Sequence, residues 1–159
     1  MLKTMVRGCF VIMMIGFAGV VFADSATANP RYVIQVDSVY DKNTDLTWAR
    51  CSVGQQWKEG SGCVGMVKTF NFDEAQHQGG NGWRVPSKDE LSTLIDYKQK
   101  GLTIDKVAFP DMNMGNLWYW TSTDNGAQLG WLVNFSIGYT YNGDNRSTSH
   151  AVRLVRNGK

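Results

Sequence analysis

The chain has 159 residues, with 16 Lys and Arg residues against 14 Asp and Glu residues, and a formal net charge of +2 at pH 7. Two of the basic residues, Lys3 and Arg7, precede an apolar N-terminal run, so the remainder carries 14 charges of each sign. A charge-balanced domain has no global electrostatic reason to bind nucleic acid or an anionic membrane, and we expect neither partner.

The N-terminus has the organisation of a cleaved secretory signal peptide. Lys3 and Arg7 form a positive segment, and residues 8–23 form an uncharged run of 16 residues. The run ends in Val21-Phe22-Ala23, with Asp24 as the polar break that follows a cleavage site. It is shorter than the roughly 20 residues that span a bilayer as a helix. The alternative interpretation is an uncleaved membrane anchor.

We therefore expect a signal peptide over residues 1–23, a short leader with the start of the first strand over 24–35, and one domain over 36–156. Cleavage after residue 23 leaves 136 of the 159 residues, which suits a single domain with its own core. The mature chain would have no stable membrane span. We expect an exported protein, located in the periplasm, at the cell surface or secreted.

Two cysteines remain after cleavage, Cys51 and Cys63, because Cys9 lies in the signal peptide. In an oxidising compartment a pair this close in sequence is expected to form a disulfide. The alternative is a metal or redox pair, but the spacing is not Cys-x-x-Cys and no histidine is nearby.

The mature chain begins with a predicted hairpin. Residues 31–40 alternate between apolar and polar side chains, residues 41–45 are typical of a turn, and residues 46–50 form the returning strand. The Gly-rich segment 51–63 is a loop tied at its two ends by the cysteines.

The predicted hairpin turn also has oxygen-bearing side chains at alternate positions, Asp41, Asn43 and Asp45, as a calcium-binding EF-hand loop does. Leu46, however, occupies the position where that loop needs glycine, and Ser52 the position of its bidentate glutamate. We therefore interpret the segment as a hairpin turn and expect no metal.

Two short helices follow. The first is expected over residues 70–78, with Asn71 as its cap and the glycines after Gln78 as its end. Ser87 and Glu90 form a capping box that begins the second, which is expected to fade at residues 100–101. On the first helix Asp73 and His77 share a face, which we interpret as a solvated pair rather than part of a metal site.

The C-terminal part is rich in strand signals. Strands are expected over residues 117–123, 130–136 and 150–156, and a polar loop over residues 139–149. A hairpin, two helices and then several strands favour an α+β fold over a parallel α/β sheet.

The sequence has no catalytic set: no serine in a nucleophile elbow, no Gly-rich phosphate loop, and no free thiol once the disulfide forms. The aromatic residues are more informative. All six tryptophans follow the signal peptide; Trp118 and Trp120 share one strand face, which predicts a common core. The candidate ligand-binding residues are those of the disulfide loop and the polar loop, namely Trp57, Lys58, Tyr139, Tyr141 and Arg146.

Several motifs occur in an order and spacing that resemble one family. They are Val39-Tyr40-Asp41, Thr44-Asp45-Leu46-Thr47-Trp48, Glu74-Ala75, Gly82-Trp83-Arg84-Val85-Pro86-Ser87, Glu90-Leu91, Phe109-Pro110, Tyr119-Trp120-Thr121-Ser122-Thr123, Trp131-Leu132-Val133-Asn134-Phe135 and Val152-Arg153-Leu154-Val155-Arg156. Over about residues 36–156 the chain resembles the Lcl C-terminal domain family, which takes its name from the Legionella collagen-like adhesin.

The resemblance implies a C-type-lectin-like fold, distantly related to formylglycine-generating enzymes, with two short helices packed on antiparallel sheet. We assign the motif residues structural roles: Trp48, Trp83, Arg84, Pro86, Ser87, Glu90, Trp120, Trp131 and Arg153. Of these, Arg84 is expected to be a buried structural cation bridging carbonyl groups rather than a ligand contact.

The resemblance further implies an exported bacterial, noncatalytic binding or adhesion module without a cofactor, with a glycan or an envelope or host-surface protein as its partner. The adhesin's domain binds sulfated glycosaminoglycans and trimerises on a collagen-like stalk, whereas this sequence has no Gly-x-y repeat and leaves the oligomeric state open. Two alternatives remain: a degenerate or divergent formylglycine-generating-type enzyme, and a structural or partner-binding envelope protein.

Overall fold

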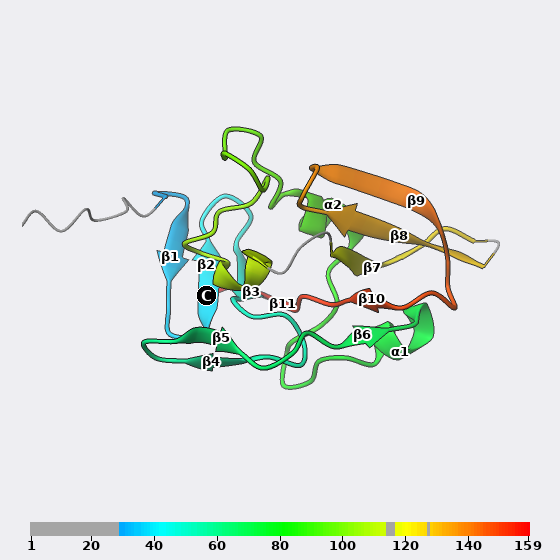
Figure 1. The fold of residues 1–159 in the computed structure, drawn as a ribbon, viewed down its shortest axis with the longest axis horizontal. Coiled ribbons are helices and arrows are strands. Elements are labelled where there is room, and N and C mark those ends of the chain that lie inside the picture. The colour runs from blue at the N-terminus through cyan, green and yellow to red at the C-terminus, as the bar shows by residue number, and fades with distance from the viewer. Residues whose placement is uncertain (1–28, 114–116, 127) are drawn as a thin grey trace, which may run out of the picture.

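The computed structural model describes residues 29–113, 117–126 and 128–159, so the predicted signal peptide lies outside the described residues. A four-stranded antiparallel sheet occupies one end of the molecule (Figure 1). Its strands, in spatial order, are β1 (Tyr32–Ile34), β2 (Ser38–Asp41), β3 (Leu46–Ala49) and β11 (Val155–Asn157).

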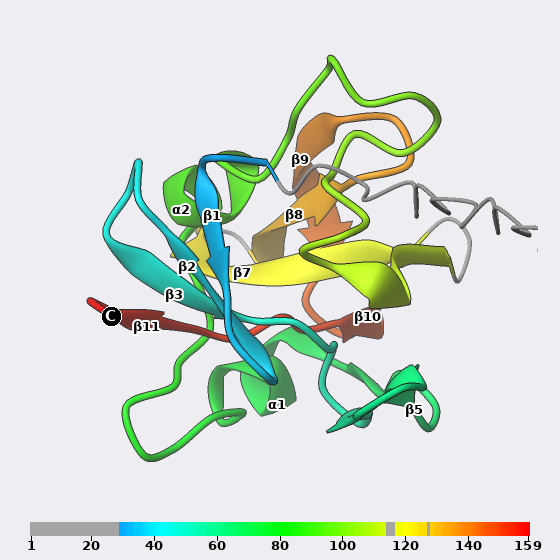
Figure 2. The ribbon, with the colours of Figure 1, turned by 90° about the vertical axis from the view of Figure 1, so that its left-hand side faces the viewer.

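A five-stranded sheet occupies the other end. Its strands, in spatial order, are β6 (Thr69–Phe70), β10 (His150–Ala151), β7 (Trp118–Asp124), β8 (Leu129–Asn134) and β9 (Tyr139–Asn145). The pair β10–β7 is parallel and the other neighbours are antiparallel, so this sheet is mixed rather than purely antiparallel. Figure 2 shows that β10 and β11 follow one another along the C-terminal segment, which therefore joins the two sheets.

The remaining elements are short. They are the hairpin β4 (Gln56–Lys58) and β5 (Gly62–Val64), the helices α1 (Phe72–Gln76) and α2 (Lys88–Ser92), and the 3₁₀ helix η1 (Pro110–Asn113). Two small helices beside mixed sheets confirm the α+β class. No helix in the described ranges is long and apolar enough to cross a membrane.

The prediction of one N-terminal strand over residues 31–40 is wrong, because this segment forms two strands, β1 and β2. The backbone turns at Gln35, whose amide donates to the carbonyl of Ser38, and β1 then pairs with β2. The side chain of Val36, expected to continue the apolar face, is 71% exposed. The turn at 41–45 is confirmed; the buried Asp41 carboxylate accepts hydrogen bonds from Arg31 and from the Asn43 amide.

Both expected caps are confirmed, since Asn71 and Ser87 each form a complete capping box. The first helix is shorter than the expected 70–78, because Phe70 belongs to β6 and α1 ends at Gln76. The predicted extension of the second helix toward residue 100 is wrong, because α2 ends at Ser92. The next amides, of Leu94 and Ile95, bond to carbonyls only three residues back, which is 3₁₀ rather than α geometry. The amide of Asp96 then donates to Thr103 and directs the chain away.

The polar loop expected over 139–149 is also corrected, because its first part is strand β9 at the edge of the large sheet. β9 pairs with β8 through a register shift between Gly130 and Leu132. This irregularity and the glycines and asparagines of β9 explain why the sequence pattern is typical of a loop.

The core has two parts. Trp48 and Tyr119 lie in the larger cluster beneath the small sheet and α2, and Trp120 lies in a second cluster with Phe72 of α1. Trp118 packs on this second cluster and is half-buried, which agrees with the expected shared face.

A buried ion pair joins the C-terminal segment to the rest of the chain. Arg153, with no exposed surface, donates to both carboxylate oxygens of Asp111 at 2.6 and 2.8 Å and to the carbonyls of Ala49 and Arg50. The Ser52 amide and hydroxyl donate to the same carboxylate. Burial alone would lower the pKa of Arg153, but the charge of Asp111 raises it on balance.

Arg153 is thus a buried structural cation, as is Arg50, and the expectation that Arg84 is buried is corrected. The Arg84 side chain is 41% exposed and makes a bidentate pair with Glu90 at 2.8 and 2.7 Å. Glu90 also accepts from the Ser87 amide, so the pair fixes the start of α2. The hydrogen bond from Arg84 holds the pKa of Glu90 below its usual value.

The Arg153–Asp111 pair yields a stability prediction. Asp111→Asn leaves a buried, uncompensated guanidinium, and we expect the free energy of unfolding to fall by about 3–5 kcal/mol. Urea denaturation measures this, and Asp89→Asn, at a carboxylate 89% exposed, is the matched control with little expected effect. A loss below about 1 kcal/mol for Asp111→Asn would contradict the assigned role.

The Arg84–Glu90 pair yields a pH prediction. A carboxylate whose pKa is lower in the folded state adds stability above its unfolded pKa of about 4.3 and loses it as the pH falls through the folded value. Glu90→Gln should therefore make the loss of stability between about pH 5 and 3 shallower. Glu59→Gln, at an exposed carboxylate of the β4–β5 turn, is the control. Equal acid sensitivity in all three proteins would contradict this assignment.

Candidate functional site

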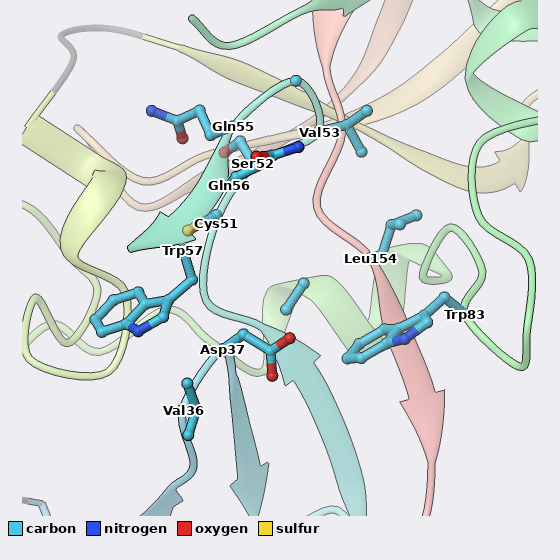
Figure 3. A pocket seen from close by; sticks show the side chains of 12 residues that line it. Val36, Asp37, Cys51, Ser52, Val53, Gln55, Gln56, Trp57, Trp83 and Leu154 are labelled. Carbon is cyan, nitrogen blue, oxygen red and sulfur yellow. The ribbon is translucent and has the colours of Figure 1, made fainter. Parts of the chain in front are cut away.

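An open cleft of about 600 Å³ lies between the small sheet, the β4–β5 hairpin and the segment that carries Trp83. Tryptophan side chains from two separate segments stand on its opposite sides, and Asp37 lies between them (Figure 3). The lining residues are Val36, Asp37, Ala49, Cys51, Ser52, Val53, Gly54, Gln55, Gln56, Trp57, Trp83 and Leu154.

The half-buried Trp57 has its position fixed by Arg50. The guanidinium carbon of Arg50 lies 3.8 Å from the centroid of the Trp57 ring, which is cation–π geometry. The guanidinium itself donates to the carbonyls of Val36, Val107 and Ala108, and burial lowers its pKa. Arg50 therefore covers one face of the Trp57 ring.

The predicted disulfide is confirmed and holds the same side of the cleft. Cys51 and Cys63 are bonded, with their Cα atoms 5.5 Å apart. Cys63 is opposite Trp57 in the β4–β5 hairpin, and Cys51 lies two residues after the end of β3. The disulfide therefore joins the hairpin that carries Trp57 to the chain just after β3. The disulfide therefore limits how far Trp57 can move from the rest of the cleft.

Trp83, on the opposite side, is held by its backbone. Its amide and carbonyl exchange hydrogen bonds with Gly80 in a tight turn. Gly79 has φ +125°, and a Cβ there would lie 2.4 Å from the Trp83 carbonyl oxygen, so only glycine fits. The guanidinium carbon of Arg156 lies 4.8 Å from the Trp83 ring centroid, so an arginine packs on this ring as well.

The polar groups of the cleft are few. Asp37 is exposed, and its carboxylate has no hydrogen-bond or ion-pair partner within the described part of the chain. Gln56 is exposed on β4 beside Trp57. A carboxylate and an amide beside two indole rings can accept and donate hydrogen bonds to a polyhydroxylated ligand.

The structure does not gather the five candidate ligand-binding residues into one site. Trp57 lines the cleft, whereas its exposed neighbour Lys58 is not among the lining residues. Tyr139 and Tyr141 lie on β9, in the other sheet, 52% and 40% exposed. Arg146 forms ion pairs with Asp73 of α1 and Asp124 of β7 and packs on the Phe72 ring, so it connects α1 to β7.

The histidines have local partners. His77 contacts the backbone carbonyl of Asp73 rather than its carboxylate, and His150 contacts Asp144 and the edge of the Trp120 ring. Within residues 29–113, 117–126 and 128–159, no group of three or more His, Cys, Asp or Glu side chains could hold a metal ion.

Sequence reasoning missed Asp37 and Arg50 and gave Trp83 only a structural role. A signal for Trp83 was present, because it follows Gly79, Gly80 and Gly82 just as Trp57 lies among the glycines of its own loop. No local signal marks Asp37, which reaches the cleft only because β1 and β2 are separate strands.

The described part of the chain is thus a disulfide-bonded α+β domain with an open cleft lined by two tryptophans. The sequence model of the Lcl C-terminal domain matches residues 37–156, and the chain therefore belongs to this family. Membership makes it an adhesin-related domain, and the family is not known for catalysis. No curated protein matches the chain.

The disulfide yields a third prediction. Replacing Cys51 and Cys63 together by alanine removes a constraint on the unfolded chain, and we expect the free energy of unfolding to fall by about 2–4 kcal/mol. Urea unfolding of the variant and of the wild type with a reducing agent should give the same lowered midpoint. An unchanged midpoint in both samples would show that the bond contributes nothing.

Proposed function

We propose that this protein is an exported, noncatalytic glycan-binding module, and that the cleft between Trp57 and Trp83 is its binding site. The observation that carries the proposal is the position of two indole rings on opposite sides of one open cleft. The predicted signal peptide over residues 1–23 and the adhesin-related family agree with export. We further assign the domain to the C-type-lectin-like fold that the family resemblance implies.

The chemistry of the cleft supports a sugar ligand. The apolar face of a sugar ring packs on an indole face, and aromatic side chains lose little conformational entropy when they bind. Arginines already hold both rings in place, so little ordering is needed on binding. Asp37 and Gln56 supply hydrogen-bonding groups at the same opening.

The enzyme and the partner-binding envelope protein are less well supported than the glycan-binding module. Formylglycine-type oxidation would need a reactive thiol, and Cys51 and Cys63 are joined to each other. The exposed side chains of Ile137, Tyr139 and Tyr141 favour an envelope protein as a second candidate partner. This surface belongs to the other sheet, so such a partner would not compete with the cleft.

The proposal predicts that single tryptophan substitutions in the cleft weaken binding without unfolding the domain. The wild type should bind at least one oligosaccharide on a glycan array, and Trp57→Ala and Trp83→Ala should each weaken that binding at least about tenfold. Trp131→Ala is the matched control, because that half-buried ring packs beside Lys88 and does not line the cleft. Silence of the folded wild type across the array, or equal loss in all three variants, would contradict the assigned site.

A further inference from the structure

The charges around the cleft define which sugars it can accept. Of the residues that line it, Asp37 is the one that carries a formal charge, and that charge is negative. Its carboxylate has no partner in the described ranges, so it is available to a ligand. A sulfate or carboxylate group on a glycan would meet like charge at this point.

None of the described residues that line the cleft is a cation. Arg50 is 8% exposed and lies against Trp57, and its guanidinium donates hydrogen bonds to three backbone carbonyls. Arg156 lies against Trp83. Neither is among the lining residues, and neither is Lys58, whose side chain alternates with that of Trp57 along β4. The exposed Lys68 lies against Gly54 of the cleft but is not a lining residue either. A sulfate bound in the cleft would therefore meet Asp37 and no cation among the described residues that line it.

We propose that the cleft binds an uncharged sugar unit, with hydroxyl groups donating to Asp37 and ring faces packing on Trp57 and Trp83, and that it rejects sulfated glycans. This inference rests on the proposed function and names the ligand class of the same site. Hydrogen bonds from hydroxyl groups to a carboxylate are charge-assisted and stronger than those between neutral groups. The family resemblance alone would have pointed to sulfated ligands.

An amino sugar is the competing ligand class, because its ammonium group would be attracted to Asp37. That attraction is weakened by solvent at an exposed carboxylate, as the repulsion of a sulfate is. Amino sugars therefore serve as a separate arm of the test.

The experiment compares uncharged polymers with charged counterparts by isothermal titration calorimetry. Dextran, xylan, mannan and chitin oligomers form the uncharged set; dextran sulfate, heparin and chitosan oligomers form the charged set. We expect at least one uncharged probe to bind, with an affinity that hardly changes with salt, and the sulfated probes to bind at least about tenfold more weakly.

The variant Asp37→Asn supplies the decisive comparison, because it removes the charge and keeps the shape. It should weaken binding of the uncharged probe about tenfold and reduce the discrimination against sulfated probes. Asp89→Asn, at a distant exposed carboxylate, should change neither. Unaltered binding in Asp37→Asn would overturn the inference.

Two other outcomes separate this inference from the proposed function. Stronger binding of heparin or dextran sulfate than of every uncharged probe, lost in Trp57→Ala, would overturn the uncharged class while keeping the site. A preference for chitosan over chitin oligomers that disappears in Asp37→Asn would overturn it in favour of amino sugars. No binding of any probe by the folded protein would count against the proposed function itself.

Discussion

The buried ion pair between Arg153 and Asp111 is the interaction on which the rest of the structure depends. Arg153 lies between β10 and β11, where the C-terminal segment passes from the large sheet to the small one. Neither side chain has any exposed surface. Removing such charges from water is costly, and the cost is offset only if both are paired and hydrogen-bonded. The backbone segments that supply those bonds are therefore fixed relative to one another.

The same network determines the base of the cleft. Arg153 donates to the carbonyls of Ala49 and Arg50, and Asp111 accepts from the amide and hydroxyl of Ser52. These residues surround Cys51, where the disulfide to the β4–β5 hairpin begins. The side chain of Arg50 in turn supports Trp57. A buried structural pair thus positions Trp57, which lines the cleft, through a short, continuous set of contacts.

Features with a local cause could be predicted from the sequence. The capped helix starts at Asn71 and Ser87 follow from side chains that bond to nearby amides, and the disulfide follows from two nearby cysteines. The family was predicted from motif order and is confirmed over residues 37–156. The end of α2 was not predicted, because helix-forming residues continue beyond Ser92 while the amides of Leu94 and Ile95 bond only three residues back.

The candidate site was predictable only in part, for the same reason. Trp57 was identified, but its opposition to Trp83 depends on how the hairpin and the Gly79–Trp83 turn pack against the small sheet. Arg84 was expected to be a buried cation that bridges carbonyl groups. The arginines that do so are Arg50 and Arg153, whose partners are distant in sequence.

The central claim is that ligand binds between the two tryptophans, and indole N–H signals in a ¹H–¹⁵N NMR titration test it most directly. With an uncharged oligosaccharide that binds on the array, the signals of Trp57 and Trp83 should shift together and saturably. Those of Trp48 and Trp120, both fully buried in the core, should stay in place. Saturable binding that leaves Trp57 and Trp83 unmoved would contradict the account.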